Sequence, residues 1–483
     1  MLKKTMAVAL AGALCCGTLM GGCSSNSPSS AASSSEPTKL VYYTIGTSGS
    51  DLSKVMTEAN KMIKSKINCT VQMNYIDYGD YDSKMTAIIN SGEDYDMCFT
   101  TSDDLYLQNV KKNAFAPLDE LLKSSGQGIL NQLDPRFWTG VKVNGKIYAV
   151  PTDKEIATPY YFIYSKDLVK KYNMDISKID SIDDLEPLFK TIKQKEPSWT
   201  PFECWQGFMI PIGYAFPISQ AIPVCIDEHS TDGKLLNFYD QQKTVDTIKT
   251  MRKYYEAGYI NKDAATLQQP SDPQSFFGMN LAGPDADSAF SSISTYPKVT
   301  HLVENPPVIT TYSTQGAMVA INSNSQHKEE AMKFINLCHT DKDLINTLYY
   351  GIKGVHWNLD SNNQIKVTPA SKNYMPQTYT MGSNIIDTPV SGSPKTWAED
   401  YKKFNKNASA SVILGFDPDT SSISSEIASI TNVTQKYQSQ LFSGCVDPDT
   451  YLPKMRQELK SAGIDKVIST LQSQLNTFMA GKK

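Results

Sequence analysis

Ser325 and Lys328 have the Ser-x-x-Lys spacing of a nucleophilic serine and its neighbouring lysine. The chain lacks the Lys-Thr-Gly and Ser-Asp-Asn triplets that accompany this pair in penicillin-recognising enzymes. A serine just before Lys-Glu-Glu also suits the start of a helix, so we expect capping here. There is no Gly-x-Ser-x-Gly or His-Glu-x-x-His, and the five histidines are scattered. We predict no catalytic residue, metal ligand or cofactor; a glycosidase carboxylate pair stays open, because its spacing of about 5–10 Å is not visible in a sequence.

Two similar acidic turns, Asp417-Pro-Asp-Thr and Asp447-Pro-Asp-Thr, offer oxygen ligands for a cation. Each turn precedes a helical pattern, and an Asp or Thr before a helix satisfies backbone N–H groups without an ion. We therefore predict helix caps at both turns.

Cys23 ends a pattern that is typical of a lipid attachment site. A cationic start leads into an apolar stretch from Ala7 to Met20, and two glycines precede the cysteine. About 14 apolar residues are too few to cross roughly 30 Å of hydrocarbon, whereas small residues before a cysteine suit signal-peptide cleavage. We predict a lipoprotein signal peptide over 1–22 and a flexible Ser-rich tether over 23–37. The mature chain is then anchored through Cys23 at the outer face of a bacterial cytoplasmic membrane.

Composition narrows the class of the remaining chain. The formal net charge is −4, and no Lys/Arg run exceeds three residues, so nucleic acid is not an expected partner. About 445 residues follow the tether, which favours two or more domains. Six cysteines follow Cys23 without any Cys-x-x-Cys. We expect them to be small buried hydrophobes, and one or two disulfides remain the alternative.

Strand and helix patterns alternate at the beginning of the folded region, which predicts a parallel, doubly wound sheet. The expected elements are strands at 39–45, 69–76 and 96–99 and helices at 52–67 and 81–90. In such sheets, ligands bind beyond the carboxyl ends of the strands. Thr47 and Asp51 follow the first strand and Asp103 follows the third. We predict that these three side chains reach a ligand, although Asp51 and Asp103 suit helix caps equally well.

The middle of the chain predicts a change of domain. A strand that ends at Pro151 does not suit the interior of a sheet, so it fits a crossing between domains. Near 306–307 the pattern changes again, and the last hundred residues are mostly helical. The expected later elements are a hairpin turn at 142–146, strands at 161–164 and 314–321, and helices at 183–194, 243–257 and 328–337.

Several stretches, taken in order, resemble a known family. They are Tyr43-Thr-Ile-Gly46, Ser91-Gly-Glu-Asp-Tyr-Asp96, Gly145-Lys-Ile-Tyr148-Ala-Val-Pro151, Asn322-Ser-Asn-Ser-Gln-His-Lys-Glu-Glu-Ala331, Gly351-Ile-Lys-Gly354-Val-His-Trp357 and Asn407-Ala-Ser-Ala-Ser-Val-Ile-Leu-Gly415-Phe416. Behind the Cys23 signal, this order resembles extracellular solute-binding lipoproteins of bacterial ABC importers, in the group related to maltose-binding protein. The last stretch and the helices after it are similar to a C-terminal domain of unknown function in that group.

The resemblance implies a type II periplasmic-binding-protein-like fold of class α/β. Two doubly wound lobes would be joined by a hinge, close over a solute and deliver it to permease subunits. We expect the first lobe at 38–152 and 307–375, and the second at 153–306 and 376–483, including the extra C-terminal helices. The relatives imply a carbohydrate cargo, above all an oligosaccharide, and a monomer without chemistry of its own. A peptide or other small solute, a secreted glycoside hydrolase and a surface adhesin remain the alternatives.

A sugar site needs aromatic plates against the apolar C–H faces and polar side chains for the hydroxyl groups. Trp205 lies among polar neighbours, Trp357 follows a Gly-rich turn, and Tyr312 lies beside the second expected crossing. Glu155 follows the first crossing, and Asn384 follows a later turn. We predict these five residues as ligand contacts beside Thr47, Asp51 and Asp103, with packing in a core as the alternative for each tryptophan.

Overall fold

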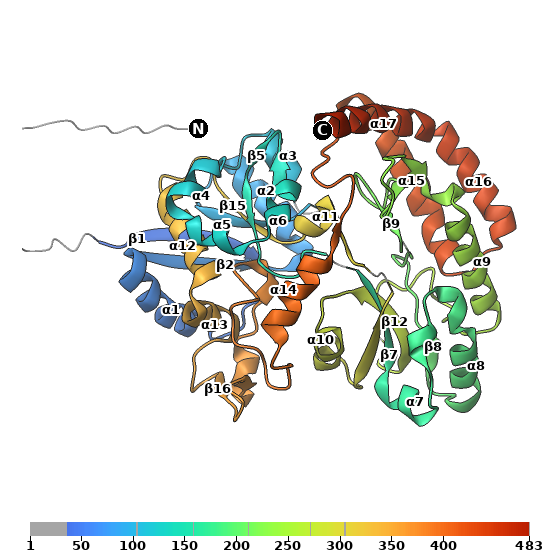
Figure 1. Ribbon diagram of the computed structural model, residues 1–483, viewed down its shortest axis with the longest axis horizontal. Helices are drawn as coiled ribbons and strands as arrows, with labels where there is room; N and C mark the ends of the chain where they lie inside the picture. The colour runs from blue at the N-terminus through green and yellow to red at the C-terminus, as the bar shows by residue number, and fades with distance from the viewer. Residues whose placement is uncertain are drawn as a thin grey trace, which may run out of the picture. The chain divides into compact units, whose positions relative to one another are not determined.

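The computed structural model describes residues 36–102, 105–157, 159–210, 212–270, 272–303 and 306–482 (Figure 1). The predicted signal peptide, Cys23 and Asp103 lie outside the described residues. No helix in the described ranges is both long and apolar enough to cross a membrane.

The first sheet has five strands in the order β2-β1-β3-β15-β6. They are β1 (Thr38–Ile45), β2 (Cys69–Ile76), β3 (Met97–Thr100), β15 (Met318–Ile321) and β6 (Ala149–Pro151). β1 pairs in parallel with β2 and β3, as the alternating patterns predict. β15 runs antiparallel to β3 and β6, since the chain enters it after a long excursion and no βαβ crossover fixes its direction. β6 forms an edge of the sheet, which agrees with its proline.

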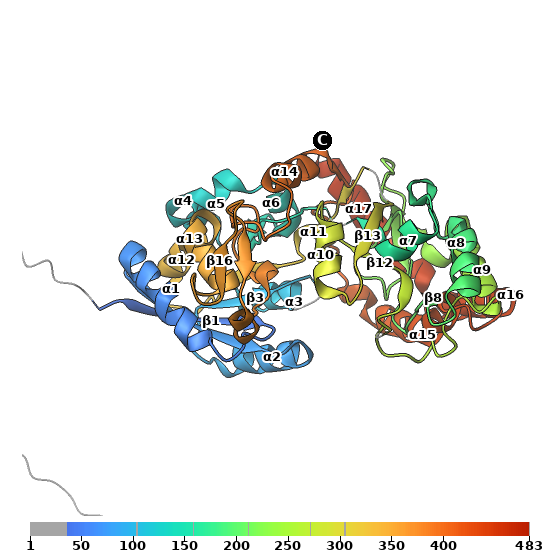
Figure 2. The ribbon, with the colours of Figure 1, turned by 90° about the horizontal axis from the view of Figure 1, so that it is seen from below.

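Helices cover the first sheet and complete the first hydrophobic core. In α1 (Leu52–Ile67) the buried residues Val55, Ala59 and Ile63 repeat every four positions, and Asn68 ends the helix in a left-handed conformation. α1 lies beside α12 (Lys328–Thr340) and α13 (Lys342–Tyr350), as Figure 2 shows. This first core includes Leu40, Tyr42 and Ile335. The predicted strand, helix, strand, helix order is therefore confirmed.

The second sheet has the strand order β13-β7-β12-β8. Its strands are β13 (Lys298–Leu302), β7 (Tyr160–Ser165), β12 (Ser275–Leu281) and β8 (Thr200–Phe202). β7 pairs antiparallel with β12 and β13, and only β8 joins β12 in parallel. The expected α/β class is confirmed, but this sheet is not parallel throughout. Its strands are joined by long and varied connections rather than by successive βαβ units, so parallel pairing is not imposed.

Aromatic side chains and the C-terminal helices fill the second core. The Phe202 and Phe277 rings meet edge to face with centroids 4.8 Å apart. α8 (Glu186–Lys195), α9 (Gln242–Glu256), α15 (Ser424–Phe442), α16 (Pro448–Ser461) and α17 (Ile464–Gly481) surround the core (Figure 1). Leu441, Leu452 and Leu471 are buried in it, so the C-terminal helices stabilise the second core.

The chain passes between the two cores three times. Ala157 packs in the first core and Phe162 in the second, Val303 packs against the second and Ile309 in the first, and Ala408 precedes the return to the second. We assigned 376–483 to the second lobe, yet Met381 and Ala408 pack in the first core. The exact lobe boundaries stay a prediction.

Local chemistry corrects or confirms several smaller expectations. Only Met318–Ile321 of the expected strand at 314–321 is extended, because Thr310 caps the short helix α11 (Thr311–Thr314) directly before it. The six described cysteines are free, and five are buried, which confirms the prediction of small hydrophobes.

Ser325 has a structural role. Its hydroxyl donates to the carboxylate of Asp96 (2.6 Å) and accepts from the N–H of His327 at the start of α12 (3.0 Å). The helix starts here as predicted, but its N-cap residue is His327, which has no side-chain cap, so the expectation that Ser325 caps α12 is wrong: its hydroxyl holds the turn that leads into the helix.

Candidate functional site

A pocket of about 270 Å³ lies where elements of the two cores meet. The first core contributes Ser102 and the nearby Leu107 of α3 (Tyr106–Lys111), and the second contributes Tyr160 of β7 and Tyr214 of β9 (Tyr214–Ala215). The segments after the second and third crossings also line the pocket. They contribute Thr310, Thr311, Tyr312, Ile413, Phe416 and Asp417.

Aromatic rings form much of the pocket wall. Tyr160, Tyr214, Phe216, Tyr312 and Phe416 line it. Tyr214 and Phe216 both contact the buried ring of Phe238, with centroids 5.6 and 5.4 Å apart, so their positions are fixed from behind. The side chain of Tyr312 is 47% exposed, which leaves its ring accessible from the pocket side. Such rings suit the apolar C–H faces of a sugar.

Two polar oxygens of the pocket are buried without a hydrogen-bond partner among the described residues. They are Oγ of Ser102 and Oδ1 of Asp417. Burial raises the pKa of the Asp417 carboxyl, although nearby Lys111 partly opposes this effect. A ligand hydroxyl that donates to Asp417 would satisfy an atom that is otherwise costly to bury.

Among the described residues, the charged side chains that line the pocket are all acidic. Glu228 and Asp417 line it, whereas none of its described lining residues is Lys, Arg or His. A neutral, hydroxyl-rich molecule fits this lining better than an anion does, because an anion would meet two carboxylates and no cationic side chain in the described lining.

The turn that begins at Asp417 follows the sequence-based expectation only in part. We predicted that an Asp or Thr of this turn caps a helix; Asp419 accepts from the N–H of Ser421, the first residue of the short helix η7 (Ser421–Ile423), whereas Asp417 lies in the pocket. The companion prediction is confirmed, since Asp447 accepts from the N–H of Asp449 at the start of α16. The two turns share four residue types and differ only in their surroundings.

Hydrogen bonds hold the pocket wall in place. The hydroxyl of Thr311 donates to the carbonyl of Ile413 (3.2 Å) and accepts from the N–H of Gly415 (2.9 Å). Gly415 has φ +81°, and a Cβ atom there would lie 2.8 Å from the carbonyl oxygen of Thr139. Only glycine suits this close approach and this φ, so α11 and the segment before Asp417 form one connected wall.

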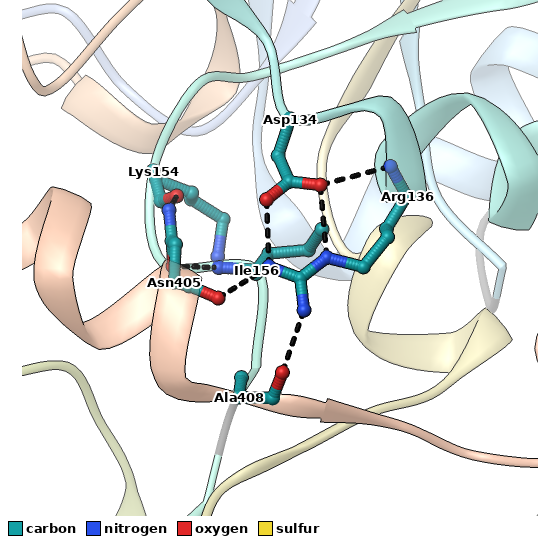
Figure 3. A network of polar contacts seen from close by, with 6 residues as sticks. All are labelled: Asp134, Arg136, Lys154, Ile156, Asn405 and Ala408. Atoms are coloured by element: carbon teal, nitrogen blue, oxygen red, sulfur yellow. Dashed lines mark hydrogen bonds and ion pairs between the residues drawn. The ribbon is translucent and has the colours of Figure 1, made fainter.

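The first and third crossings are joined by an amide clamp (Figure 3). Asn405, near the end of α14 (Trp397–Asn407), accepts from the N–H of Ile156 through Oδ1 (2.8 Å). Its Nδ2 donates to the carbonyl of Lys154 (2.9 Å). Arg136 forms a two-point ion pair with Asp134 and donates to the carbonyl of Ala408 (2.6 Å). These hydrogen bonds fix the position of α14 relative to the first crossing.

The second and third crossings are joined by backbone pairing. β14 (Val308–Ile309) pairs in parallel with β18 (Ser409–Ala410). The N–H of Ser411 extends this ladder to the carbonyl of Ile309 (2.8 Å). Together with the Asn405 clamp, this pairing links all three crossings.

Of the residues predicted as ligand contacts, Tyr312 lines the pocket. Glu155 lies on the first crossing and forms an ion pair with Lys154 (2.9 Å). Trp205 packs against Phe208 beside the second core, with ring centroids 5.2 Å apart. Neither Glu155 nor Trp205 is among the residues that line this pocket.

Trp357, Asn384, Thr47 and Asp51 lie on the first-core side, outside the pocket lining. Trp357 is only 5% exposed and donates from its indole to the carbonyl of Gly351 (2.8 Å). Asn384 accepts from the hydroxyl of Tyr349 (2.8 Å). Thr47 is exposed in the loop after β1.

Asp51 does not cap α1 and is largely buried. Its carboxylate accepts from Lys54 (2.7 Å) and faces the ring Nε2 of His356 (3.3 Å). The hydrogen bond from Lys54, followed by that from His356, lowers the pKa of Asp51. These partners occupy the carboxylate.

Sequence reasoning identified the loop that contains Ser102, through the neighbouring Asp103, but missed most of the pocket wall, namely Tyr160, Tyr214, Phe216, Phe416 and Asp417. The signal for two of them was present, because Phe416 ends a stretch that carried the family resemblance and Asp417 directly follows it. Tyr160, Tyr214 and Phe216 have no local pattern that separates them from other aromatic residues of the chain.

Comparison with known proteins gives the context of this pocket. The sequence profile described as "Bacterial extracellular solute-binding protein" matches residues 56–364, and the profile "Domain of unknown function (DUF3502)" matches 412–480. A Streptococcus pneumoniae protein named "Carbohydrate ABC transporter substrate-binding protein" is 35% identical, over 98% of this chain and 96% of that protein. Lipoprotein LipO of Bacillus subtilis is 23% identical over 55% of this chain and 52% of that protein.

Solved structures show the same fold. The N-glycan transport solute binding protein NgtS from Streptococcus pneumoniae superposes with a TM-score of 0.87 at 33% identity, covering 92% of this chain and 100% of that chain. The structure of NgtS in complex with Man5GlcNAc gives a TM-score of 0.77 at 33% identity, covering 92% and 99%. These similarities confirm the resemblance inferred from the sequence, including that of the C-terminal region.

Proposed function

Because the chain belongs to the bacterial extracellular solute-binding proteins, we propose that it is the carbohydrate receptor of an ABC importer and binds an oligosaccharide in the pocket between its two cores. The observation that carries this proposal is the pocket lining. It combines aromatic rings, among them the exposed Tyr312, with the partnerless oxygens of Ser102 and Asp417.

The chemistry of the lining suits a sugar ring. Tyr312 and Tyr214 offer apolar faces for C–H groups, and the Asp417 carboxylate accepts from hydroxyl groups. The names of the relatives support a carbohydrate, and the NgtS complexes support a glycan of several residues. We propose Ser102, Tyr214, Tyr312, Phe416 and Asp417 as contacts.

The earlier candidates have different roles in this proposal. Trp205 and Trp357 pack within the protein, and Asp51, Glu155 and Asn384 maintain contacts inside the chain.

The receptor acts as one part of a larger importer. We propose that Cys23 carries a lipid that holds the protein at the outer face of the cytoplasmic membrane, and that separate permease subunits receive the cargo. The protein acts as a monomer and carries no chemistry of its own. Ligand that contacts both cores favours the closed arrangement by the difference between its affinities for the two states.

A thermal-shift screen tests this function. We expect Man5GlcNAc and related neutral oligosaccharides to raise the midpoint, since a ligand that binds only the folded state stabilises it by about 2.7 kcal/mol at a hundred times its Kd. Amino acids and short peptides form the second arm. A shift with peptides alone would refute the carbohydrate receptor, and steady release of shortened glycan by purified protein would replace it with the hydrolase.

A further inference from the structure

A second pocket, of about 590 Å³, adjoins the first along the C-terminal helix α17. Phe416 and Asp417 line both pockets, so the two pockets meet at these residues. On its far side, the second pocket is lined by Asn144 in the turn between β4 (Lys142–Val143) and β5 (Lys146–Ile147). It therefore lies between the first-core hairpin and the helix that ends the chain.

We propose that this second pocket is a saccharide subsite, which takes the part of an oligosaccharide that extends beyond the pocket at Tyr312. The inference rests on the proposed function and extends cargo recognition within the C-terminal region at 412–480 from Phe416 and Asp417 to helix α17.

The first argument is size. The pocket at Tyr312 offers about 270 Å³, just below the common range of roughly 300–1,000 Å³ for small-molecule sites. A branched glycan of several residues needs more room than this. The second pocket supplies about 590 Å³ directly beside it.

The second argument is the continuity of the wall. The rings of Phe416 and Phe478 lie with centroids 5.5 Å apart and both line the second pocket, so the wall that Phe416 shares with the first pocket continues into the second. The side chain of Gln474 holds the shared segment against α17 by accepting from the N–H of Asp419 (2.7 Å) and donating to its carbonyl (2.9 Å). The surface between the pockets is thus fixed from α17.

The third argument is the polar chemistry of the second pocket. Ser473 and Thr477 lie one turn apart on α17 and line it together with Asn144. Nζ of Lys482 donates to the carbonyl of Leu414 (2.8 Å), so this ammonium group is already engaged with the backbone. Lys142 also lines this pocket. Hydroxyl, amide and ammonium groups beside an aromatic ring suit the hydroxyl groups and C–H faces of a saccharide.

The test is a matched pair of substitutions on the exposed surface of α17. Ser473→Trp places a large ring at the second pocket, whereas Ser469→Trp makes the same change one turn earlier, at a residue outside that lining. Calorimetry measures the binding of Man1GlcNAc and Man5GlcNAc to the wild type and both variants. We expect Ser473→Trp to weaken Man5GlcNAc by about tenfold or more and to leave Man1GlcNAc within about twofold, with Ser469→Trp unchanged.

The outcomes separate this inference from the proposed function. If Ser473→Trp leaves Man5GlcNAc unchanged, or weakens both glycans equally, the second pocket is not a subsite while the receptor function stands. If Ser469→Trp has the same effect as Ser473→Trp, the effect is not local and the inference is wrong. If the wild type binds neither glycan, the proposed function fails and the inference fails with it.

Discussion

Asn405 is the residue through which α14 holds the first crossing, and its replacement by alanine tests whether this clamp stabilises the folded protein. The side chain is 7% exposed, and both of its amide groups bond to the backbone of the crossing. Asn407→Ala is the matched control, because Asn407 lies on the same helix and is exposed.

The magnitude follows from the two groups that lose a partner. In the alanine variant the N–H of Ile156 loses its acceptor, Oδ1 of Asn405. Ile156 is fully buried, so water does not replace this acceptor. An unsatisfied buried donor costs about 1–3 kcal/mol, and the Lys154 carbonyl adds a smaller cost, because a carbonyl is more easily left with one lone pair unused. We expect Asn405→Ala to lower the free energy of unfolding by about 2–4 kcal/mol. The control should change it by less than about 0.5 kcal/mol.

Urea unfolding followed by circular dichroism measures both variants. A lower midpoint with an unchanged slope means lower stability, whereas a changed slope indicates that the two cores no longer unfold together. The reasoning is refuted if Asn405→Ala stays within about 0.5 kcal/mol of the wild type, since the hydrogen bonds of the clamp would then contribute nothing net.

Three further predictions concern the pocket and one buried carboxyl. Tyr312→Ala should weaken carbohydrate binding by about 1–3 kcal/mol in calorimetry, whereas Tyr451→Ala, on α16 and outside the pocket lining, should not. The wild type should bind a sialylated glycan at least about tenfold more weakly than its neutral form, and Asp417→Asn should narrow that ratio in competition assays. Burial raises the pKa of Asp387 to about 7. Between about pH 3.9, the pKa of an unfolded aspartate, and about pH 7, the native state keeps a proton that the unfolded state releases. The free energy of unfolding therefore falls by up to about 4 kcal/mol as the pH rises through this range. Urea unfolding at pH 5 and pH 8 should show about 2.7 kcal/mol of this fall in the wild type, and Asp387→Asn should remove it.

The elements that sequence reasoning predicted well are those with a strong local pattern. β1, α1 and β2 carry their periodicity within a few turns, and the proline at the end of β6 identifies an edge strand without further information. The direction of β15 was not predictable in this way, since it depends on where the chain returns after it has built the second core.

The candidate site was harder to predict because its residues meet only through long-range contacts. Asp51 follows the first strand, as a ligand contact in such a sheet should, yet His356 lies far along the chain and occupies its carboxylate. Asp417 and Asp447 have the same local sequence, but one borders a pocket and the other caps a helix. Local sequence fixes the chemical options of a side chain, whereas burial and distant partners decide which option is used.

The pocket wall and the crossings are one continuous structure, and this connection explains how cargo can act on the hinge. Tyr312 follows β14 by a few residues, and Asp417 follows β18 in the same way. β14 and β18 pair with each other, and Thr311 ties the two segments together at the pocket itself. A ligand that contacts Tyr312 and Asp417 therefore binds to the ends of the second and third crossings rather than to distant loops. In the proposed receptor, the difference between the ligand's affinities for the open and closed states would therefore be transmitted directly to the crossings that form the hinge.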